Sequence, residues 1–92
     1  MRVIHKQQLQ LVGKQLITLP KYSKILSVQY QRGMICVWYS ILEGTDSTLS
    51  HMNETREIMI VGTGHPYKEG DFNYVDTIQD HNFVWHIFER TV

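Results

Sequence analysis

Residues 24–42, KILSVQYQRGMICVWYSIL, decide the fold class of this 92-residue chain. β-Branched and aromatic residues alternate with polar ones on both sides of Arg32-Gly33, and this period of two is typical of half-buried strands. If Arg32 and Gly33 form a two-residue turn, the loop length fixes the register of the hairpin. The predicted pairs are then Gln31 with Met34, Tyr30 with Ile35, Val28 with Val37, and Leu26 with Tyr39.

This register sorts the hairpin into two faces. One face is mostly polar, and Trp38 is its exception. The other is apolar and carries Leu26, Val28, Tyr30, Ile35, Val37, Tyr39 and Ile41. An antiparallel sheet with a core on one side and water on the other has this pattern. Three roles stay open for Trp38: cover for a second small cluster, a subunit contact, or a ligand platform.

Shorter runs predict five more strands, at residues 3–10, 15–19, 56–61, 75–79 and 83–89. Pro20 ends the second of these because it has no amide hydrogen for the ladder. The strand at 56–61 is apolar on both faces, so we place it centrally. Asp80 and Asn82 suit the positive φ of the turn that joins the last two strands.

These elements predict an all-β fold, a small antiparallel sandwich or barrel of about seven short strands. One short helix is allowed, at residues 69–74. Residues 43–54 are polar and rich in turn formers, which predicts a long connection that is either functional or loose. A chain of 92 residues has room for a single domain, spanning residues 1–92, and excludes separate cofactor and substrate domains.

Charge and composition limit the partners. Nine Lys plus Arg offset nine Asp plus Glu, so the formal net charge is zero and no strong field would gather nucleic acid or acidic lipid. We therefore expect neither nucleic acid nor a membrane as partner. A domain this small buries a limited share of its surface, so subunit pairing would add stability and we expect a homo-oligomer.

Cysteine usage and the N-terminus favour a reducing cytoplasm. The single cysteine, Cys36, lies in an apolar run and cannot form an internal disulfide. The first residues lack the apolar core of a signal peptide. No later segment approaches the roughly 20 apolar residues that a membrane-spanning helix requires.

The segment Gly62-Thr63-Gly64-His65-Pro66 is the best candidate for a binding site. Its glycines would let successive backbone amides point into one hollow that holds an anion. The alternative is a plain turn by which the strand leaves the sheet, because the spacing matches neither a phosphate-binding P-loop nor a dinucleotide motif.

In the ligand-binding interpretation, Thr63 and His65 donate hydrogen bonds, Lys68 or Arg32 supplies positive charge, and Tyr67 or Trp38 stacks on a base. The candidate site residues are Gly62, Thr63, Gly64, His65, Tyr67, Lys68, Arg32 and Trp38.

The sequence predicts no metal site, no cofactor and no enzymatic activity. Its five histidines lack the short spacings of zinc ligands. His81 and His86 lie across a tight hairpin, where a turn residue and a half-buried strand residue are the ordinary roles. No segment places a nucleophile on a strained turn beside a base, and Cys36 suits a packed strand thiol.

Four segments resemble a family of short proteins from tailed bacteriophages: KILSVQ at 24–29, CVW at 36–38, GTGHP at 62–66 and FVWHIFE at 83–89. The resemblance implies a phage gene product in the cytoplasm of a bacterial host, and it implies no particular mechanism. Small phage proteins without catalytic motifs usually act by binding. We therefore expect a non-enzymatic accessory protein that counteracts a host process or defence by sequestering an anionic or nucleotide-like small molecule.

The main alternative is a protein-binding inhibitor of a host enzyme or defence complex, acting through an exposed strand edge or the Trp38 face. Two further alternatives are a virion-associated protein and a nucleotide hydrolase that depends on His65.

Overall fold

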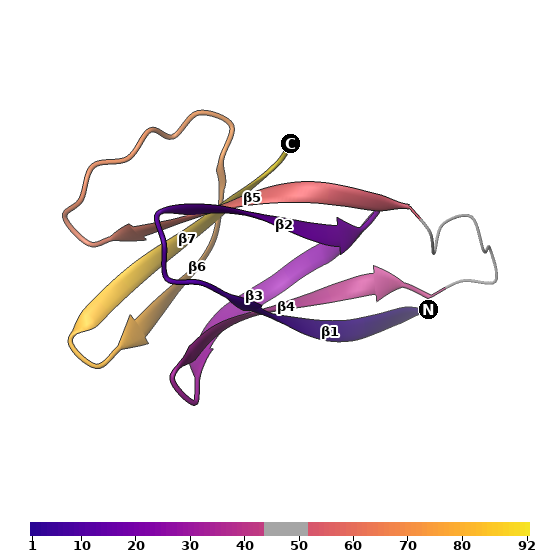
Figure 1. Ribbon diagram of the computed structural model, residues 1–92, viewed down its shortest axis with the longest axis horizontal. Coiled ribbons are helices and arrows are strands. Elements are labelled where there is room, and N and C mark those ends of the chain that lie inside the picture. The colour runs from indigo at the N-terminus through magenta and orange to yellow at the C-terminus, as the bar shows by residue number, and fades with distance from the viewer. Residues whose placement is uncertain (44–51) are drawn as a thin grey trace.

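The computed structural model describes residues 1–43 and 52–92, and these form an all-β sandwich without a helix (Figure 1). Sheet A has the strand order β1-β4-β3 and sheet B the order β2-β5-β7-β6, with every pair antiparallel. The strands are β1 (Arg2–Leu9), β2 (Lys14–Pro20), β3 (Lys24–Gln31), β4 (Met34–Leu42), β5 (Asn53–Gly62), β6 (Asn73–Asp80) and β7 (Phe83–Thr91). The predicted fold class is confirmed.

The structure differs from the sequence prediction in three local features. The short helix allowed at residues 69–74 is wrong: the Phe72 amide donates to the Glu69 carbonyl at 3.0 Å in a turn, and β6 begins at Asn73. In the β6–β7 hairpin, His81 takes the positive φ, at 53°, where the sequence suggested Asp80 and Asn82. Of the predicted 43–54 connection, residues 44–51 lie outside the described residues, and Asn53 and Glu54 already belong to β5.

The central hairpin has the predicted register over most of its length. Gln31 pairs with Met34, Tyr30 with Ile35, and Val28 with Val37. The predicted pair of Leu26 with Tyr39 is wrong, because the register shifts between Ile25 and Ser27. This bulge turns Leu26 outward, with 51% of its surface exposed, and places Ile25 opposite Tyr39 and against the core.

The core lies between the two sheets and is mostly aliphatic. β5 is central in sheet B, as predicted, and its residues alternate between two buried environments. Ile58 and Ile60 face the main core, whereas Met59 and Val61 lie on the outer face of the sheet with Phe88. The main core comprises Leu9, Ile17, Leu19, Val28, Ile35, Val37, Ile58, Ile60, Ile78 and Ile87.

Sheet A and sheet B approach each other closely along one side, where β3 and β6 are edge strands. There the carboxylate of Asp76 accepts a hydrogen bond from the Val28 amide at 3.0 Å. Both strands carry a bulge near this contact. The bond occupies a backbone donor that an edge strand would otherwise leave open. On the other side, β1 and β2 each have one neighbouring strand within residues 1–43 and 52–92.

Arg56 occupies one end of the core layer. It precedes Ile58 on the inner face of β5 and is 8% exposed. Its guanidinium donates to the Ser23 carbonyl at 2.7 Å and forms ion pairs with Glu54 at 2.6 Å and Glu89 at 3.0 Å. A buried charge needs such a complete set of partners.

Candidate functional site

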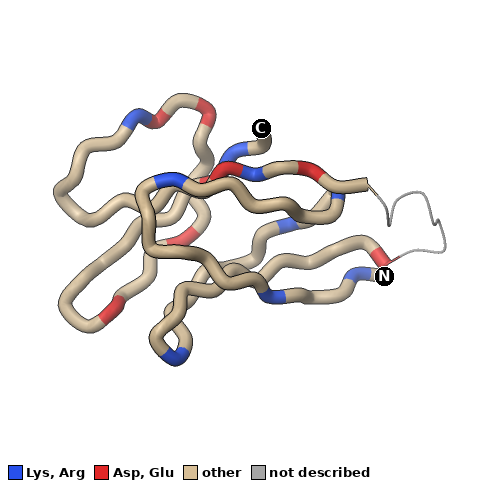
Figure 2. Tube along the Cα trace, viewed as in Figure 1, with Lys and Arg blue, Asp and Glu red and all other residues tan. Residues whose placement is uncertain are grey.

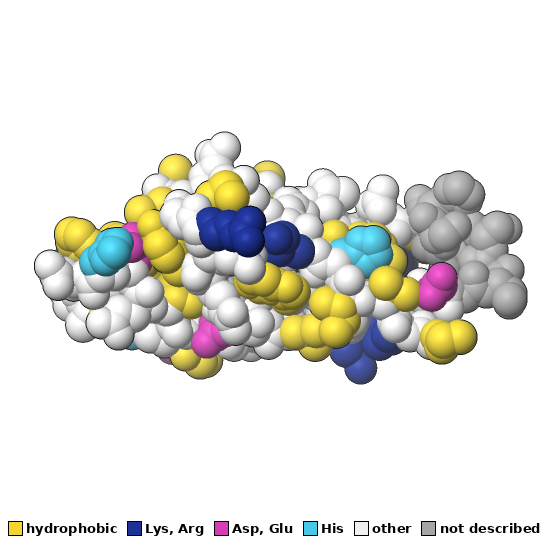
Figure 3. Space-filling model, turned by 90° about the horizontal axis from the view of Figure 1, so that it is seen from below, with side chains coloured by type: hydrophobic (Ala, Val, Ile, Leu, Met, Phe, Trp, Pro, Cys, Tyr) yellow, Lys and Arg dark blue, Asp and Glu magenta, His cyan; other side chains and the backbone are white. Residues whose placement is uncertain are grey.

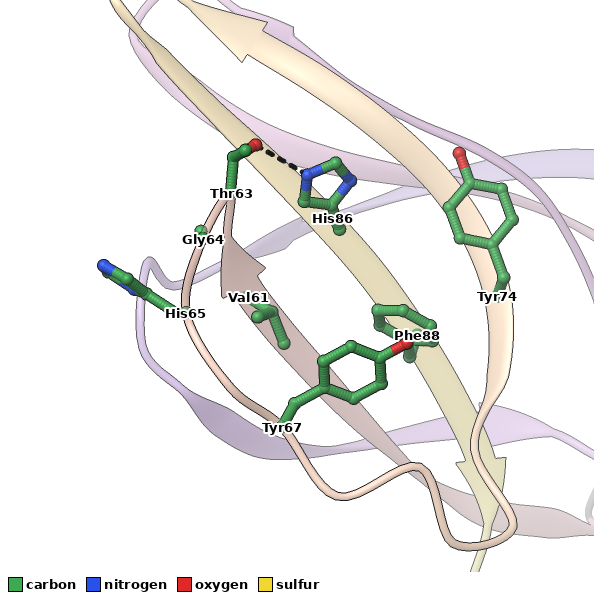
Figure 4. A pocket seen from close by; sticks show the side chains of 9 residues that line it. Val61, Thr63, Gly64, His65, Tyr67, Tyr74, His86 and Phe88 are labelled. Carbon is green, nitrogen blue, oxygen red and sulfur yellow. Dashed lines mark hydrogen bonds between the residues drawn. The ribbon is translucent and has the colours of Figure 1, made fainter.

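The segment from Thr63 to Phe72, here called the β5–β6 loop, crosses the outer face of sheet B (Figures 1 and 4). The Tyr67 ring lies on Phe88 of β7, with 4.8 Å between ring centroids. Tyr74 of β6 meets the same Phe88 ring edge-on, at 5.8 Å. Phe72 packs against the cluster of Met59, Val61 and Phe88. The second small cluster of this fold is therefore covered by the loop and not by Trp38.

Beneath the loop is a hollow of about 290 Å³, here called the aromatic hollow. Its size approaches the lower end of the usual range for small-molecule sites. Tyr67 and Phe88 form one end, and Thr63 with His86 forms the other (Figure 4). The lining residues are Val61, Gly62, Thr63, Gly64, His65, Tyr67, Tyr74, His86 and Phe88.

A chain of hydrogen bonds runs along the wall of this hollow. The Thr63 hydroxyl lies 2.8 Å from His86 Nε2, and His86 Nδ1 lies 3.1 Å from the Thr77 hydroxyl. The Thr77 hydroxyl in turn lies 2.6 Å from the hydroxyl of Tyr74. The tautomer of the ring decides which nitrogen donates, and each hydroxyl can be the donor or the acceptor in its bond with His86. The chain fastens the start of the loop to β7 and gives the hollow a polar wall.

On the other side of the loop lies a second hollow of about 350 Å³, here called the basic hollow. Its lining includes Lys14 at the start of β2 and Lys68 of the loop, together with Met59 and Pro66. Lys14 and Lys68 thus reach one hollow from segments far apart in the sequence. Figure 2 shows that Lys and Arg are spread over both sheets and alternate with Asp and Glu. Neither ammonium has a carboxylate within 4 Å among the described residues. Gly62, Val61, His65 and Tyr67 line both hollows.

The expected cluster of anion-binding amides is not formed. The Thr63 amide donates to the Val84 carbonyl at 3.3 Å, and the His65 amide donates to the Gly62 carbonyl at 3.1 Å. Thr63 continues the pairing of β5 with β7 by one residue, and Gly64, with φ of 86°, completes a tight turn. The amides of Thr63 and His65 therefore already have acceptors within the chain, and side chains line the hollows beside them.

Gly62 lies where a side chain would have little room. A Cβ at this position would lie 3.1 Å from His65 Nδ1 and 3.2 Å from Cζ3 of Trp85. The two rings therefore lie on the side of Gly62 to which a Cβ would point. The His65 side chain points away from the aromatic hollow (Figure 4), so its predicted role as a donor in that hollow is not supported.

A family model described as "Domain of unknown function (DUF7352)" matches residues 1–92. The chain belongs to this family. No curated protein and no solved structure gives a match.

In this family member, the structure brings together six of the eight residues that the sequence proposed. Gly62, Thr63, Gly64, His65 and Tyr67 line the aromatic hollow, and Lys68 lines the basic hollow.

Arg32 and Trp38 belong to sheet A and line neither hollow. Arg32 is the first turn residue of the β3–β4 hairpin, with φ of 52°. Trp38 is half-buried on β4, where the Lys6 ammonium lies 5.8 Å from its ring centroid. On the face drawn in Figure 3, hydrophobic side chains form separate patches among polar ones.

Sequence reasoning missed several site residues because they come from other strands. Alternation along residues 83–89 puts His86 and Phe88 on one face of the last strand, but it does not reveal which residues of other strands lie beside them. The sheet order β5-β7-β6 brings them between Val61 and Tyr74. Lys14 was missed because it joins the site only through the pairing of β2 with β5.

Histidines and acids do not gather into a metal centre within residues 1–43 and 52–92. His81 lies 3.8 Å from Asp80 in the exposed hairpin, whereas His86 is held between two hydroxyls.

Proposed function

We propose that this protein is a non-enzymatic binding protein that captures a nucleotide-like small molecule at the β5–β6 loop. The observation that carries the proposal is the junction of the two hollows. An aromatic hollow and a hollow with two lysines that have no carboxylate partner among the described residues share the walls formed by Gly62, His65 and Tyr67. A ligand with a planar ring and an attached anionic group is complementary to both.

The ring would lie in the aromatic hollow. Tyr67 is 48% exposed although one of its faces lies on Phe88, so its ring remains accessible to a ligand. Aromatic side chains stack on any base and contribute roughly 1–3 kcal/mol for each base. The hydroxyl groups of Thr63 and Tyr74, at the polar wall, can donate to or accept from the edge of a base.

The anionic group would lie in the basic hollow. Lys14 and Lys68 approach it from different segments, so a phosphate between them would contact two ammonium groups. This arrangement replaces the backbone-amide mechanism that the sequence suggested. The site has two lysines, and the chain as a whole has a formal net charge of zero, so no further positive field adds to them. The site therefore suits a ligand with few anionic charges.

The biological role in this proposal is sequestration. A protein that only binds acts stoichiometrically and lowers the free concentration of its ligand. Together with the resemblance to short proteins of tailed bacteriophages, this favours a phage accessory protein that acts in the cytoplasm of a bacterial host against a host process or defence.

Isothermal titration calorimetry with AMP, ADP, GMP and GDP tests the capture of nucleotides. We expect a dissociation constant in the micromolar range for at least one of them. Tyr67→Leu and Lys68→Gln should each weaken binding about tenfold or more, whereas Lys24→Gln, an exposed lysine on β3, should not. The absence of saturable heat with every nucleotide would refute the proposal.

Analysis of the nucleotide after incubation with the protein distinguishes binding from catalysis. Chromatography should return the nucleotide unchanged. Turnover that disappears in His65→Ala would instead establish a hydrolase.

A second candidate function is the inhibition of a host protein by strand addition. It is favoured by the open edges of β1 and β2, where Ile4 is 62% and Leu16 is 63% exposed. Pull-down from a bacterial lysate distinguishes this function. A stoichiometric protein partner that is lost in Leu16→Lys, together with no nucleotide binding, would favour inhibition.

A further inference from the structure

A third hollow, of about 530 Å³, adjoins the site at the end of sheet B. It is lined by Gly62, Thr63, His65, Asn82, Phe83, Val84 and Trp85. We propose that this hollow, here called the Phe83 shelf, receives a second planar ring of the same ligand, so that the preferred ligand is a dinucleotide. This inference rests on the proposed function, because it extends the same ligand across the loop.

The aromatic pair of the shelf is arranged for stacking. Phe83 is 61% exposed, and its ring lies nearly parallel to Trp85, with an angle of 15° and 5.9 Å between centroids. Phe83 directly follows the turn at His81 and Asn82, so only a short hairpin holds it in place. An exposed aromatic ring beside a hollow is the surface on which a base can stack.

Trp85 adds a second observation at the same place. Its indole nitrogen is buried and has no hydrogen-bond partner in the described part of the chain. A buried donor without a partner destabilises a fold and is rare in native structures. Trp85 also packs against the main core, which fixes the ring that supports Phe83.

The shelf is continuous with the nucleotide site. Gly62, Thr63 and His65 line both the aromatic hollow and the shelf. The His65 side chain points away from the aromatic hollow (Figure 4), and its ring and Trp85 both lie on the side of Gly62 to which a Cβ would point. Phe83 and Trp85 alternate along β7 with His86 and Phe88, so the shelf and the aromatic hollow lie on opposite faces of sheet B. A ligand that joins them passes round the turn at Thr63 and Gly64, where His65 lines both hollows.

The chemistry of the three hollows specifies the ligand class. Two hollows with aromatic walls suit two bases, and the basic hollow, which also contains His65, suits the phosphate that accompanies them. A mononucleotide would fill one aromatic hollow and leave the shelf empty. A dinucleotide would place one base in the aromatic hollow and the other on the Phe83 shelf.

The affinity of the linear dinucleotide pApA, compared with that of AMP, tests this inference by calorimetry. The wild type should bind pApA at least tenfold more tightly than AMP. Phe83→Leu should remove this advantage and leave AMP binding unchanged. Tyr30→Leu, an exposed aromatic residue on sheet A, should alter neither affinity.

Fluorescence provides an independent measurement, because the chain has two tryptophans and Trp38 lies outside the site. In Trp38→Phe, the remaining emission comes from Trp85, and pApA should quench it more than saturating AMP does. Circular dichroism verifies that Phe83→Leu and Trp38→Phe are folded.

Equal affinities for pApA and AMP, or an unchanged pApA advantage in Phe83→Leu, would overturn the inference and leave the proposed function standing. Failure of both nucleotides to bind would instead overturn the proposed function itself.

Discussion

At the scale of single residues, Arg56 shows how a charge is accommodated in a small apolar core. Burial lowers the pKa of the guanidinium, but the hydrogen bonds and negative charges of Glu54 and Glu89 outweigh it and raise the pKa above its ordinary value. A raised pKa means that the charged form is favoured by folding. The stabilisation is therefore present throughout the acidic and neutral range and is lost only in strong alkali.

We predict that Arg56→Gln lowers the free energy of unfolding by about 3 kcal/mol, because it leaves the Ser23 carbonyl and two carboxylates without their shared donor. Arg90→Gln is the matched control. Arg90 is 37% exposed and pairs with Glu57 at 2.7 Å, so its loss should cost less than about 1 kcal/mol. Urea denaturation measures the free energy of unfolding of both variants. Equal decreases in Arg56→Gln and Arg90→Gln would contradict the special role of Arg56.

Gly62 affects stability because there is little space for a side chain at this position. We predict that Gly62→Ala lowers the free energy of unfolding by about 1–2 kcal/mol, because the added methyl group meets the rings of His65 and Trp85 at 3.1 and 3.2 Å. Gly13→Ala should change stability little, since nothing lies within 4 Å of a Cβ there. Thermal unfolding followed by circular dichroism compares the two variants. A neutral Gly62→Ala would show that these rings move aside freely.

At the scale of elements, the strands could be predicted from sequence and their irregularities could not. Alternation of apolar and polar residues is local, so it located all seven strands and the two buried faces of β5. The bulge at Leu26 lies close to the contact between β3 and the edge strand β6, and no local pattern reveals it. The same applies to the aromatic hollow, whose walls come from β5, β6, β7 and the β5–β6 loop.

For the β5–β6 loop, the sequence indicated which residues lie together but not which backbone amides are free. The structure places its glycines and His65 in the lining of a hollow, but the amides of Thr63 and His65 donate to carbonyls of the chain. Which amides stay free depends on whether the strand continues for one more residue, and Thr63 does continue the pairing with β7.

The contact between edge strands β3 and β6 supports a prediction at this scale. We predict that Asp76→Ala lowers the free energy of unfolding by about 1–3 kcal/mol and speeds hydrogen exchange of the Val28 amide, which loses its acceptor. Asp76→Asn keeps a side-chain oxygen that can accept the hydrogen bond, so it should lower the free energy of unfolding by less. Asp71→Ala, at an 82% exposed side chain, serves as the control. Unchanged protection of Val28 in Asp76→Ala would argue against this bond.

At the scale of the whole molecule, a homo-oligomer remains our proposal. The core is small, and the edges of β1 and β2 are open on the side away from β3 and β6. Size-exclusion chromatography with light scattering should give at least twice the 10.9 kDa mass of one chain at micromolar concentrations. A monomer mass that persists up to millimolar concentration would contradict the proposal.

The central claim is that the β5–β6 loop forms a nucleotide site with side chains of β6 and β7. The most direct measurement is a titration of the ¹⁵N-labelled protein with AMP, followed by two-dimensional NMR. Shifts should concentrate at residues 62–68 and at Tyr74, His86 and Phe88, and the amides of Arg32 and Trp38 on sheet A should stay in place. A spectrum without changes, or with changes confined to sheet A, would contradict the account.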